Sequence, residues 1–199
     1  MRLDEIGYII SQYTNVLDQP EEFNTRMNWG QNQLFYECIK NKDFSPLEPF
    51  KYVRGENGTP PLTFVNGICL LPTDYVFERG MYYLLDGEPV RVNVLNVKDY
   101  ENFMVSHLEY PTKKHPIANI ISDHIRLLPK DIRFVVFTYI KKPTNIFYAI
   151  DTSLGYAQYD PANSIEFEWD ENNQVTIIML VLESLGIIAT REEINAKKK

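Results

Sequence analysis

The chain has 199 residues, of which 44% are hydrophobic and 13% aromatic, and its formal net charge is −7. This composition can bury a substantial core and excludes an intrinsically disordered chain. The acidic balance disfavours a protein that coats nucleic acid, which needs a basic face. It is compatible with a protein past which DNA slides, because like charge repels phosphate.

Composition also bears on compartment and partners. No apolar run approaches the roughly 18 residues that a membrane span requires, and the acidic start, with Asp4 and Glu5, is unlike a signal peptide. We therefore expect no membrane partner and synthesis in a reducing cytoplasm. Cys38 and Cys69 are expected to be buried free thiols, because a disulfide framework or a zinc site needs more cysteines.

The first part of the chain, residues 1–42, predicts a helical hairpin. Apolar residues at helical spacing indicate a helix over Leu3–Leu17. A second helix is expected over Pro20–Lys40, with Asp18 and Glu21 as its start signal. Two helices joined by so short a connection are typical of an antiparallel pair.

Residues 43–61 predict an extended arm. The segment contains four prolines and two glycines, which disfavour both a helix and a central strand. It also contains Phe44, Phe50 and Tyr52, and these large apolar side chains indicate that the arm lies on a surface of this chain or of a neighbour.

Residues 62–160 carry a β pattern with one short helix, expected over Lys98–Leu108. Asp86-Gly87 is a strong two-residue turn signal. Strands are expected at Phe64–Leu71, Tyr75–Leu85, Val90–Val94, Ile117–Ile121, Ile125–Leu128, Ile132–Ile140, Ile146–Ile150 and Tyr156–Tyr159. Ile132–Ile140 is apolar on both faces and is therefore expected to be a central strand.

The sequence Leu-Leu-Pro-x-Asp occurs twice in this β region, at Leu70–Asp74 and Leu127–Asp131. In each copy a strand is expected to end, the proline to open a turn and the aspartate to hydrogen-bond the local backbone. The similarity of the flanking residues is too slight for a duplication, so the repeat indicates a shared turn architecture.

Residues 161–199 predict a C-terminal helix and a tail. Asp170 can cap a helix over Glu171–Leu185, which Gly186 can end. Thr190 and Glu193 form a capping-box pattern for a short last helix.

The fold class that follows is α+β, because the strands come in a run and do not alternate with helices. The N-terminal hairpin and the C-terminal helix are expected to pack together. A mostly antiparallel β region, containing one short helix, is inserted between them.

Catalytic and metal signatures are not recognisable in the sequence. His107, His115 and His124 lack metal-ligand spacing, and the neighbouring side chains of Ser122-Asp123-His124 point apart, unlike a catalytic triad. Nucleotide-binding glycine loops and a nucleophile elbow are absent. We therefore expect no enzyme, catalytic residue, cofactor or metal. A hydrolase that uses a pair of carboxylates stays open, because the distance between two such groups in space cannot be read from the sequence.

Two further patterns leave alternatives open. The acidic segment Glu166–Asn172 can offer oxygen ligands to calcium, but it is more typical of an edge strand entering a helix whose N-terminus favours acidic residues. The aromatic residues between Tyr75 and Tyr83 can form a sugar-binding platform, although cross-strand packing is the usual explanation. This platform is the basis of an alternative function, a β-module that binds glycan or peptide on a phage or cell surface.

Three stretches resemble a known family. They are Pro20–Phe35 ("PEEFNTRMNWGQNQLF"), His115–Ile150, which contains "RLLPKDI" and "YIKKP", and Tyr159–Ile187, which begins "YDP" and ends in Leu-Gly-Ile. In this order they are similar to the head-to-tail connector, or neck, proteins of tailed bacteriophages, nearest to those of crAss-like and other Bacteroidota phages. Together they cover about half of the chain, and none is a catalytic signature.

The resemblance implies a structural virion protein made in the host bacterial cytoplasm and located at the neck of the particle. Such connectors form rings, often of about twelve copies, that bind the portal protein, extend the DNA channel and present a platform for the next tail or ring protein. DNA would pass through without specific binding. On this basis the residues expected to contact partners are Phe44, Phe50, Tyr52, Ile187, Ile188, Ile194, Lys197, Lys198 and Lys199.

Overall fold

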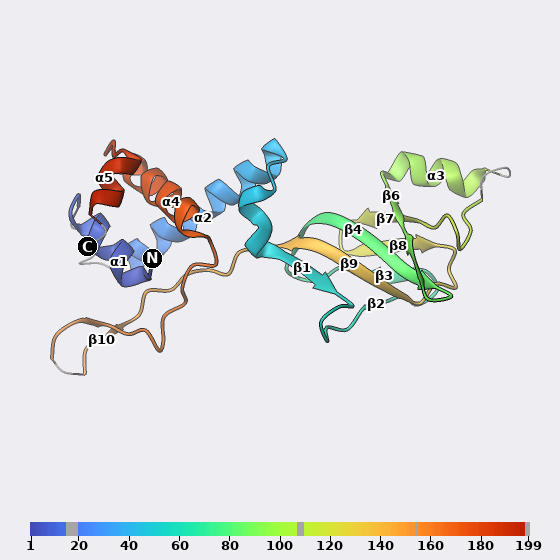
Figure 1. Cartoon of the computed structure of the whole chain (residues 1–199), viewed down its shortest axis with the longest axis horizontal. Coiled ribbons are helices and arrows are strands. Elements are labelled where there is room, and N and C mark those ends of the chain that lie inside the picture. The colour runs from blue at the N-terminus through green and yellow to red at the C-terminus, as the bar shows by residue number, and fades with distance from the viewer. Residues whose placement is uncertain (15–19, 107–109, 154, 198–199) are drawn as a thin grey trace. The chain divides into compact units, whose positions relative to one another are not determined.

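The computed structural model describes residues 1–14, 20–106, 110–153 and 155–197, and the chain divides into two compact units (Figure 1). Unit 1 combines Met1–Phe50 with Pro143–Lys199, and unit 2 is Lys51–Lys142. The predicted α+β class is therefore confirmed, with the β region inserted between terminal helical segments. The inserted unit spans Lys51–Lys142, whereas the predicted β region spans 62–160.

Unit 1 is built around a helix near the end of the chain. Helix α4 is the element against which α1, α2 and α5 all pack. The first helix ends earlier than predicted, and Leu17 and Asp18 lie outside the described residues. The elements of this unit are α1 (Leu3–Ser11), α2 (Pro20–Asn41), the 3₁₀ helix η2 (Ser45–Phe50), β10 (Ile150–Asp151), β11 (Gln158–Tyr159), α4 (Glu171–Ser184) and α5 (Arg191–Ala196).

The predicted ends of the last two helices are confirmed. The Asp170 side chain accepts a hydrogen bond from the Asn173 backbone N–H at the start of α4. Thr190 and Glu193 form the capping box of α5. Gly186, with φ +77°, follows α4 in the left-handed region that glycine favours.

The prediction of an extended arm over 43–61 is wrong in its first half. Ser45–Phe50 forms a 3₁₀ helix despite two prolines, because so short a helix requires few backbone donors. Leu47 and Phe50 are fully buried. The Phe50 ring lies 4.7 Å from that of Trp169 and 5.6 Å from that of Phe35, so apolar packing holds the segment in unit 1.

Two asparagines of α2 bind the backbone of an extended segment, residues 144–148. The Asn28 side chain accepts from the Ile146 N–H and donates to its carbonyl, both at 2.9 Å. One helical turn earlier, Asn24 accepts from the Tyr148 N–H at 2.6 Å and donates to its carbonyl at 3.3 Å. Each side-chain amide therefore pairs with a backbone residue as a neighbouring strand would.

Gln31 completes this row, which we call the amide ladder (Asn24, Asn28 and Gln31). It is 1% exposed and donates to the Thr144 carbonyl at 3.1 Å. Asn24 and Asn28 are four helical residues apart, a rise of about 6 Å, which nearly matches the rise of about 6.6 Å for two residues of extended chain. Gln31 is only three residues further along and meets the next alternate backbone residue with its longer side chain. The strand predicted over Ile146–Ile150 is accordingly reduced to β10, because α2 takes the place of its partner strand.

Helices α2 and α4 approach closely at Gly30. A Cβ atom built on Gly30 would lie 2.9 Å from Val181 Cγ2 and 3.1 Å from Ile177 Cγ2. Both neighbours are buried and β-branched, so they have little freedom to move away. The close contact of α2 with α4 thus depends on glycine at position 30, because glycine has no Cβ atom.

Unit 2 contains two sheets that share one apolar core. One sheet has the order β1-β9-β4-β5 with β2 also paired to β9, and the other has the order β3-β8-β7-β6. All ladders are antiparallel except β6–β7. The elements are β1 (Lys51–Arg54), β2 (Leu62–Thr63), β3 (Ile68–Leu70), β4 (Tyr75–Leu85), β5 (Glu88–Arg91), β6 (Asn93–Leu95), α3 (Val97–Val105), β7 (Ile117–Ile121), β8 (His124–Leu128) and β9 (Phe134–Lys141).

Several predictions for unit 2 are confirmed. Strand β9 is central, and Asp86 and Gly87 connect β4 to β5 with positive φ values of 54° and 89°. The predicted strand Val90–Val94 is instead interrupted at the buried Val92, where the chain passes from one sheet to the other. The predicted strand Phe64–Leu71 is broken as well, by a turn that includes Gly67 at φ +76°.

Both Leu-Leu-Pro-x-Asp segments make the same turn contact. The Pro72 carbonyl accepts from the Tyr75 N–H at 3.1 Å, and the Pro129 carbonyl accepts from the Ile132 N–H at 3.4 Å. In each case the turn follows a strand of the second sheet and leads into a strand of the first. The repeat therefore marks two crossings between the sheets that share this turn hydrogen bond.

The amide ladder yields a stability prediction. Replacing Asn28 with alanine leaves the Ile146 backbone groups without partners, and we expect the free energy of unfolding to fall by about 2–3 kcal/mol. Trp29 and Trp169 are the only tryptophans of the chain and both lie in unit 1, so their emission in a urea titration reports this unit. The matched control is Gln33→Ala, an exposed amide of the same helix, with an expected change below about 0.5 kcal/mol. Equal effects of the two variants would contradict the ladder's role.

The helix contact at Gly30 yields a second prediction. An alanine there would ordinarily stabilise a helix by about 0.5–1 kcal/mol. Here we expect Gly30→Ala to destabilise unit 1 by about 1–2 kcal/mol, because the added methyl overlaps Val181. The double variant Gly30→Ala/Val181→Ala should lose less unfolding free energy than the sum of the losses of the two single variants. Simple additivity in the same urea titration would refute the overlap.

Candidate functional site

The residues considered for catalysis do not form a catalytic arrangement. His124 Nδ1 lies 2.9 Å from Asp123, whose pKa is lowered by that hydrogen bond, and Arg126 reaches the other ring nitrogen at 3.4 Å. Ser122 is exposed in the turn at φ +47°. His115 is exposed in a separate turn. His107 lies outside the described residues.

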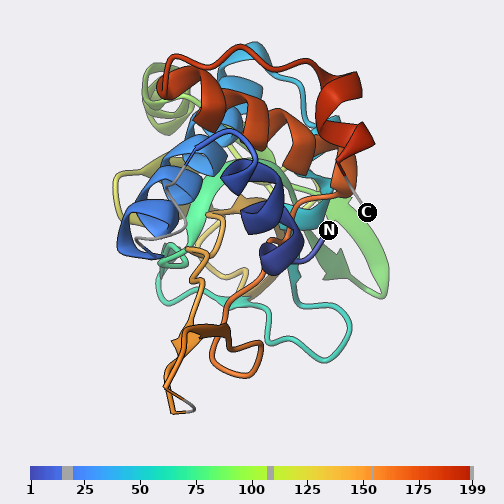
Figure 2. The same cartoon turned by 90° about the vertical axis from the view of Figure 1, so that its left-hand side faces the viewer.

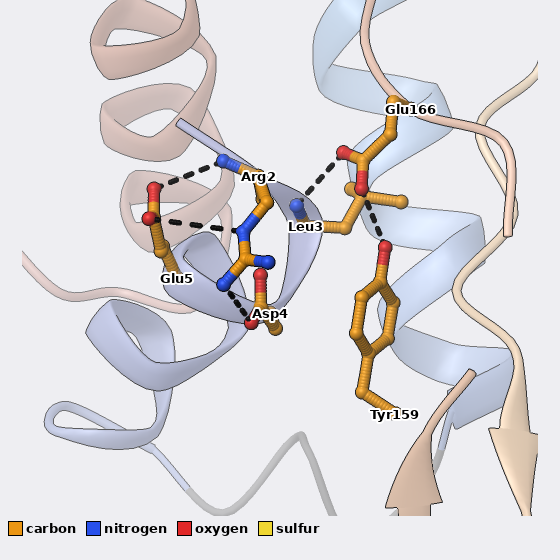
Figure 3. A network of polar contacts seen from close by, with 6 residues as sticks. All are labelled: Arg2, Leu3, Asp4, Glu5, Tyr159 and Glu166. Carbon is orange, nitrogen blue, oxygen red and sulfur yellow. Dashed lines mark hydrogen bonds and ion pairs between the residues drawn. The ribbon is translucent and has the colours of Figure 1, made fainter. Parts of the chain in front are cut away.

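The acidic segment before α4 has structural contacts (Figure 3). The Glu166 carboxylate accepts from the Leu3 backbone N–H at 2.8 Å and from the Tyr159 hydroxyl at 2.5 Å. Burial, together with that hydrogen bond to Glu166, raises the pKa of Tyr159 to about 12. Within the described ranges no three His, Cys, Asp or Glu side chains are grouped so that they could hold a metal ion. The predicted edge strand in this segment is not formed.

Both cysteines are free thiols, as predicted. Cys38 is buried in α2, and Cys69 in β3 is half-buried. Burial raises the pKa of both thiols, so each is less reactive as a nucleophile than an ordinary cysteine.

The aromatic residues of β4 do not form an exposed platform. Tyr83 is buried, and its hydroxyl donates to the Lys113 carbonyl. Tyr75 packs against the core and stacks on Phe137 with ring centres 5.8 Å apart. Phe77 and Tyr82 are half-buried. The sequence-based interpretation of this strand as a sugar-binding surface is therefore wrong for Tyr75 and Tyr83.

Two of the predicted partner contacts are internal. Phe50 and Ile194 are both fully buried within unit 1, so neither offers surface to another molecule and the prediction is wrong for them. Sequence alone shows that these positions are apolar. It does not show which apolar residues of the same chain cover them.

The other predicted contacts differ in exposure. Ile188 is 93% exposed and is the most accessible of the set, whereas Ile187 and Phe44 are half-buried. Tyr52 is 36% exposed in β1, with its ring edge-on to Tyr139. Phe44, Ile187 and Ile188 belong to unit 1 and Tyr52 to unit 2, and their role as contacts stays a prediction.

The basic tail is described only at its first residue. The Lys197 ammonium lies 3.8 Å from the centre of the Tyr13 ring, a cation–π contact within unit 1. Lys198 and Lys199 lie outside the described residues.

Charge is distributed unequally between the two units, a feature that the total of −7 conceals. Unit 1 has eight basic and seventeen acidic residues, a formal charge of −9, whereas unit 2 has twelve basic and ten acidic residues, a charge of +2. Counting along the sequence detects this difference once the boundaries at Lys51 and Lys142 are known. The two units therefore present surfaces of opposite average charge.

Comparison with known proteins gives no identification: neither the protein-family models nor the curated proteins contain a match to this chain. Across the helices that the structure describes, none is both long and apolar enough to span a membrane.

We expect the free energy of unfolding of unit 2 to fall at high pH, because tyrosine side chains are packed in its core. Burial raises the pKa of Tyr75 to about 12, whereas an unfolded tyrosine ionises near 10. The stabilisation linked to this raised pKa is fully present below pH 10 and is lost as the pH rises towards 12. Tyr75→Phe should flatten the decline of unfolding free energy over that range, measured by urea titration followed by circular dichroism of the strands at successive pH values. Tyr8→Phe, an exposed position, is the control, and an unchanged decline in Tyr75→Phe would contradict the assignment.

Proposed function

We propose that this chain is a structural head-to-tail connector of a tailed bacteriophage. In this role it forms a ring, of about twelve copies in related connectors, that binds the portal, extends the DNA channel and supports assembly of the next tail or ring protein. Its place would be the neck of the virion, after synthesis in the host cytoplasm. The basis of the proposal is the resemblance of three separate stretches to that family.

One structural observation carries most of the support, namely that the first and third resembling stretches meet the end of the second, residues 143–150, in unit 1. Asn24, in the first stretch, binds the backbone of Tyr148 in the second. Helix α2 also packs on α4, which belongs to the third stretch. Phe147 and Ile165 exchange two backbone hydrogen bonds between the second and third. The first stretch, the third stretch and the last residues of the second, which lie far apart in the sequence, thus pack together, as expected if they belong to the shared core of a family.

Charge also favours the proposal. The acidic balance of unit 1 disfavours adhesion of DNA, which suits a channel through which the genome moves. The acidic unit 1 and the on average basic unit 2 also give each copy two different surfaces, which head-to-tail association requires.

The proposal is tested by the mass of the full chain with and without the portal protein of the same phage genome, measured by native mass spectrometry. We expect a ring-sized assembly that binds the portal and retains no short duplex DNA at physiological salt. A chain that stays monomeric and ignores the portal would overturn the proposal. Gene order provides an independent check, because a connector gene should lie beside portal or capsid genes.

A further inference from the structure

An acidic hairpin extends from unit 1. Strands β10 and β11 pair with Ile150 opposite Tyr159 and Asp151 opposite Gln158, and Figure 2 shows this orange hairpin extending beyond the helices of its unit. Ile150 is 39% exposed and Tyr156 is 60% exposed. We define the acidic arm as Ile150, Asp151, Tyr156 and Asp160.

The carboxylates of the acidic arm are held in fixed positions. Asp151 accepts from the Ser153 backbone N–H at 2.8 Å, and Asp160 accepts from the Ala162 N–H at 3.0 Å. The hydrogen bond from Asn163 is the main cause of the lowered pKa of Asp160. The arm therefore presents hydrogen-bonded carboxylates beside accessible apolar side chains.

A groove of complementary character lies on unit 2. It has a volume of about 370 Å³, and no carboxylate side chain is found among its described lining residues. The residues that define this basic groove are Arg91, Phe103, Tyr110, Lys114, His115 and Pro116. Lys114 and His115 lie on a tight turn, closed by the His115 N–H donating to the Thr112 carbonyl at 3.0 Å.

We propose that the acidic arm of one copy docks in the basic groove of the next copy, so that copies join head to tail. The choice of a second copy as occupant rests on the proposed function, because a ring requires two different adhesive faces on every subunit. The opposite charges of arm and groove favour encounter and fix the orientation. Ile150 and Tyr156 supply apolar area to meet Phe103 and Tyr110.

The contact is heterologous, which has a geometric consequence. An arm and a groove remain unoccupied at the two ends of any open chain of copies, so association continues until the chain closes into a ring, as the proposed function requires, and it gives a filament where the rotation between copies does not close. Self-association should also weaken as salt rises, because exposed charges are screened beyond about 8 Å at physiological ionic strength.

Charge reversal tests the proposal on the full-length chain by sedimentation velocity at low and high salt. Lys114→Glu and Asp151→Lys should each raise the dissociation constant of self-association at least tenfold, because each places like charges together. An equal mixture of the two variants should assemble again, since every arm then meets a groove of opposite charge. One chain carrying both changes should assemble for the same reason. These rescues exclude misfolding as the cause of the loss.

The controls are Lys98→Glu in unit 2 and Glu37→Lys in unit 1, which make the same charge changes at other exposed positions. Both should associate as the unaltered chain does. Undiminished assembly of Lys114→Glu, or failure of the mixture to assemble, would overturn the proposal. So would binding of a short DNA duplex by the groove without self-association.

Portal binding by the same variants separates this inference from the proposed function. A chain that binds the portal but does not associate through arm and groove refutes the inference alone. A chain that associates through them but ignores the portal supports the inference and refutes the connector function.

Discussion

The amide ladder is the interaction on which unit 1 depends. An extended segment packed against a helix leaves its backbone donors and acceptors without strand partners, and burying such groups unpaired is costly. The side chains of Asn24, Asn28 and Gln31 supply those partners at the interval of a helical turn. The match between one helical turn and two residues of extended chain makes this substitution of helix for strand possible. It also connects the segment that returns from unit 2 to helix α2.

The ladder explains why the long, weakly amphipathic helix α2 can be central to the unit. The ladder residues on its polar side bind backbone instead of solvent, and its apolar face packs on α4 with Gly30 at the closest approach. Helix α2 is thus partnered on two sides by segments from the C-terminal half of the chain. The N- and C-terminal parts of the sequence are consequently parts of one structural unit.

Sequence reasoning succeeded where the determinant is local. The caps Asp170 and Thr190 and the turn Asp86-Gly87 depend on residues within a few positions of one another, and all three are present in the structure. It failed where the determinant is distant. The 3₁₀ helix at Ser45–Phe50 is held by Trp169, more than a hundred positions away, and no local pattern indicates that contact. For the same reason Phe50 and Ile194 looked like partner contacts, and the charge difference between the units stayed hidden until their boundaries were known.

The pairing of β1 with β9 has a consequence for how this protein can change in evolution. Lys51, where the chain enters unit 2, is paired with Ile140, close to the point where the chain leaves it. The inserted unit therefore starts and finishes at adjacent positions, a property of segments that recombination can exchange with little disturbance to the host domain. A lineage could replace the whole of unit 2 with another module, and alter what the protein recognises, while keeping the residues of unit 1 unchanged.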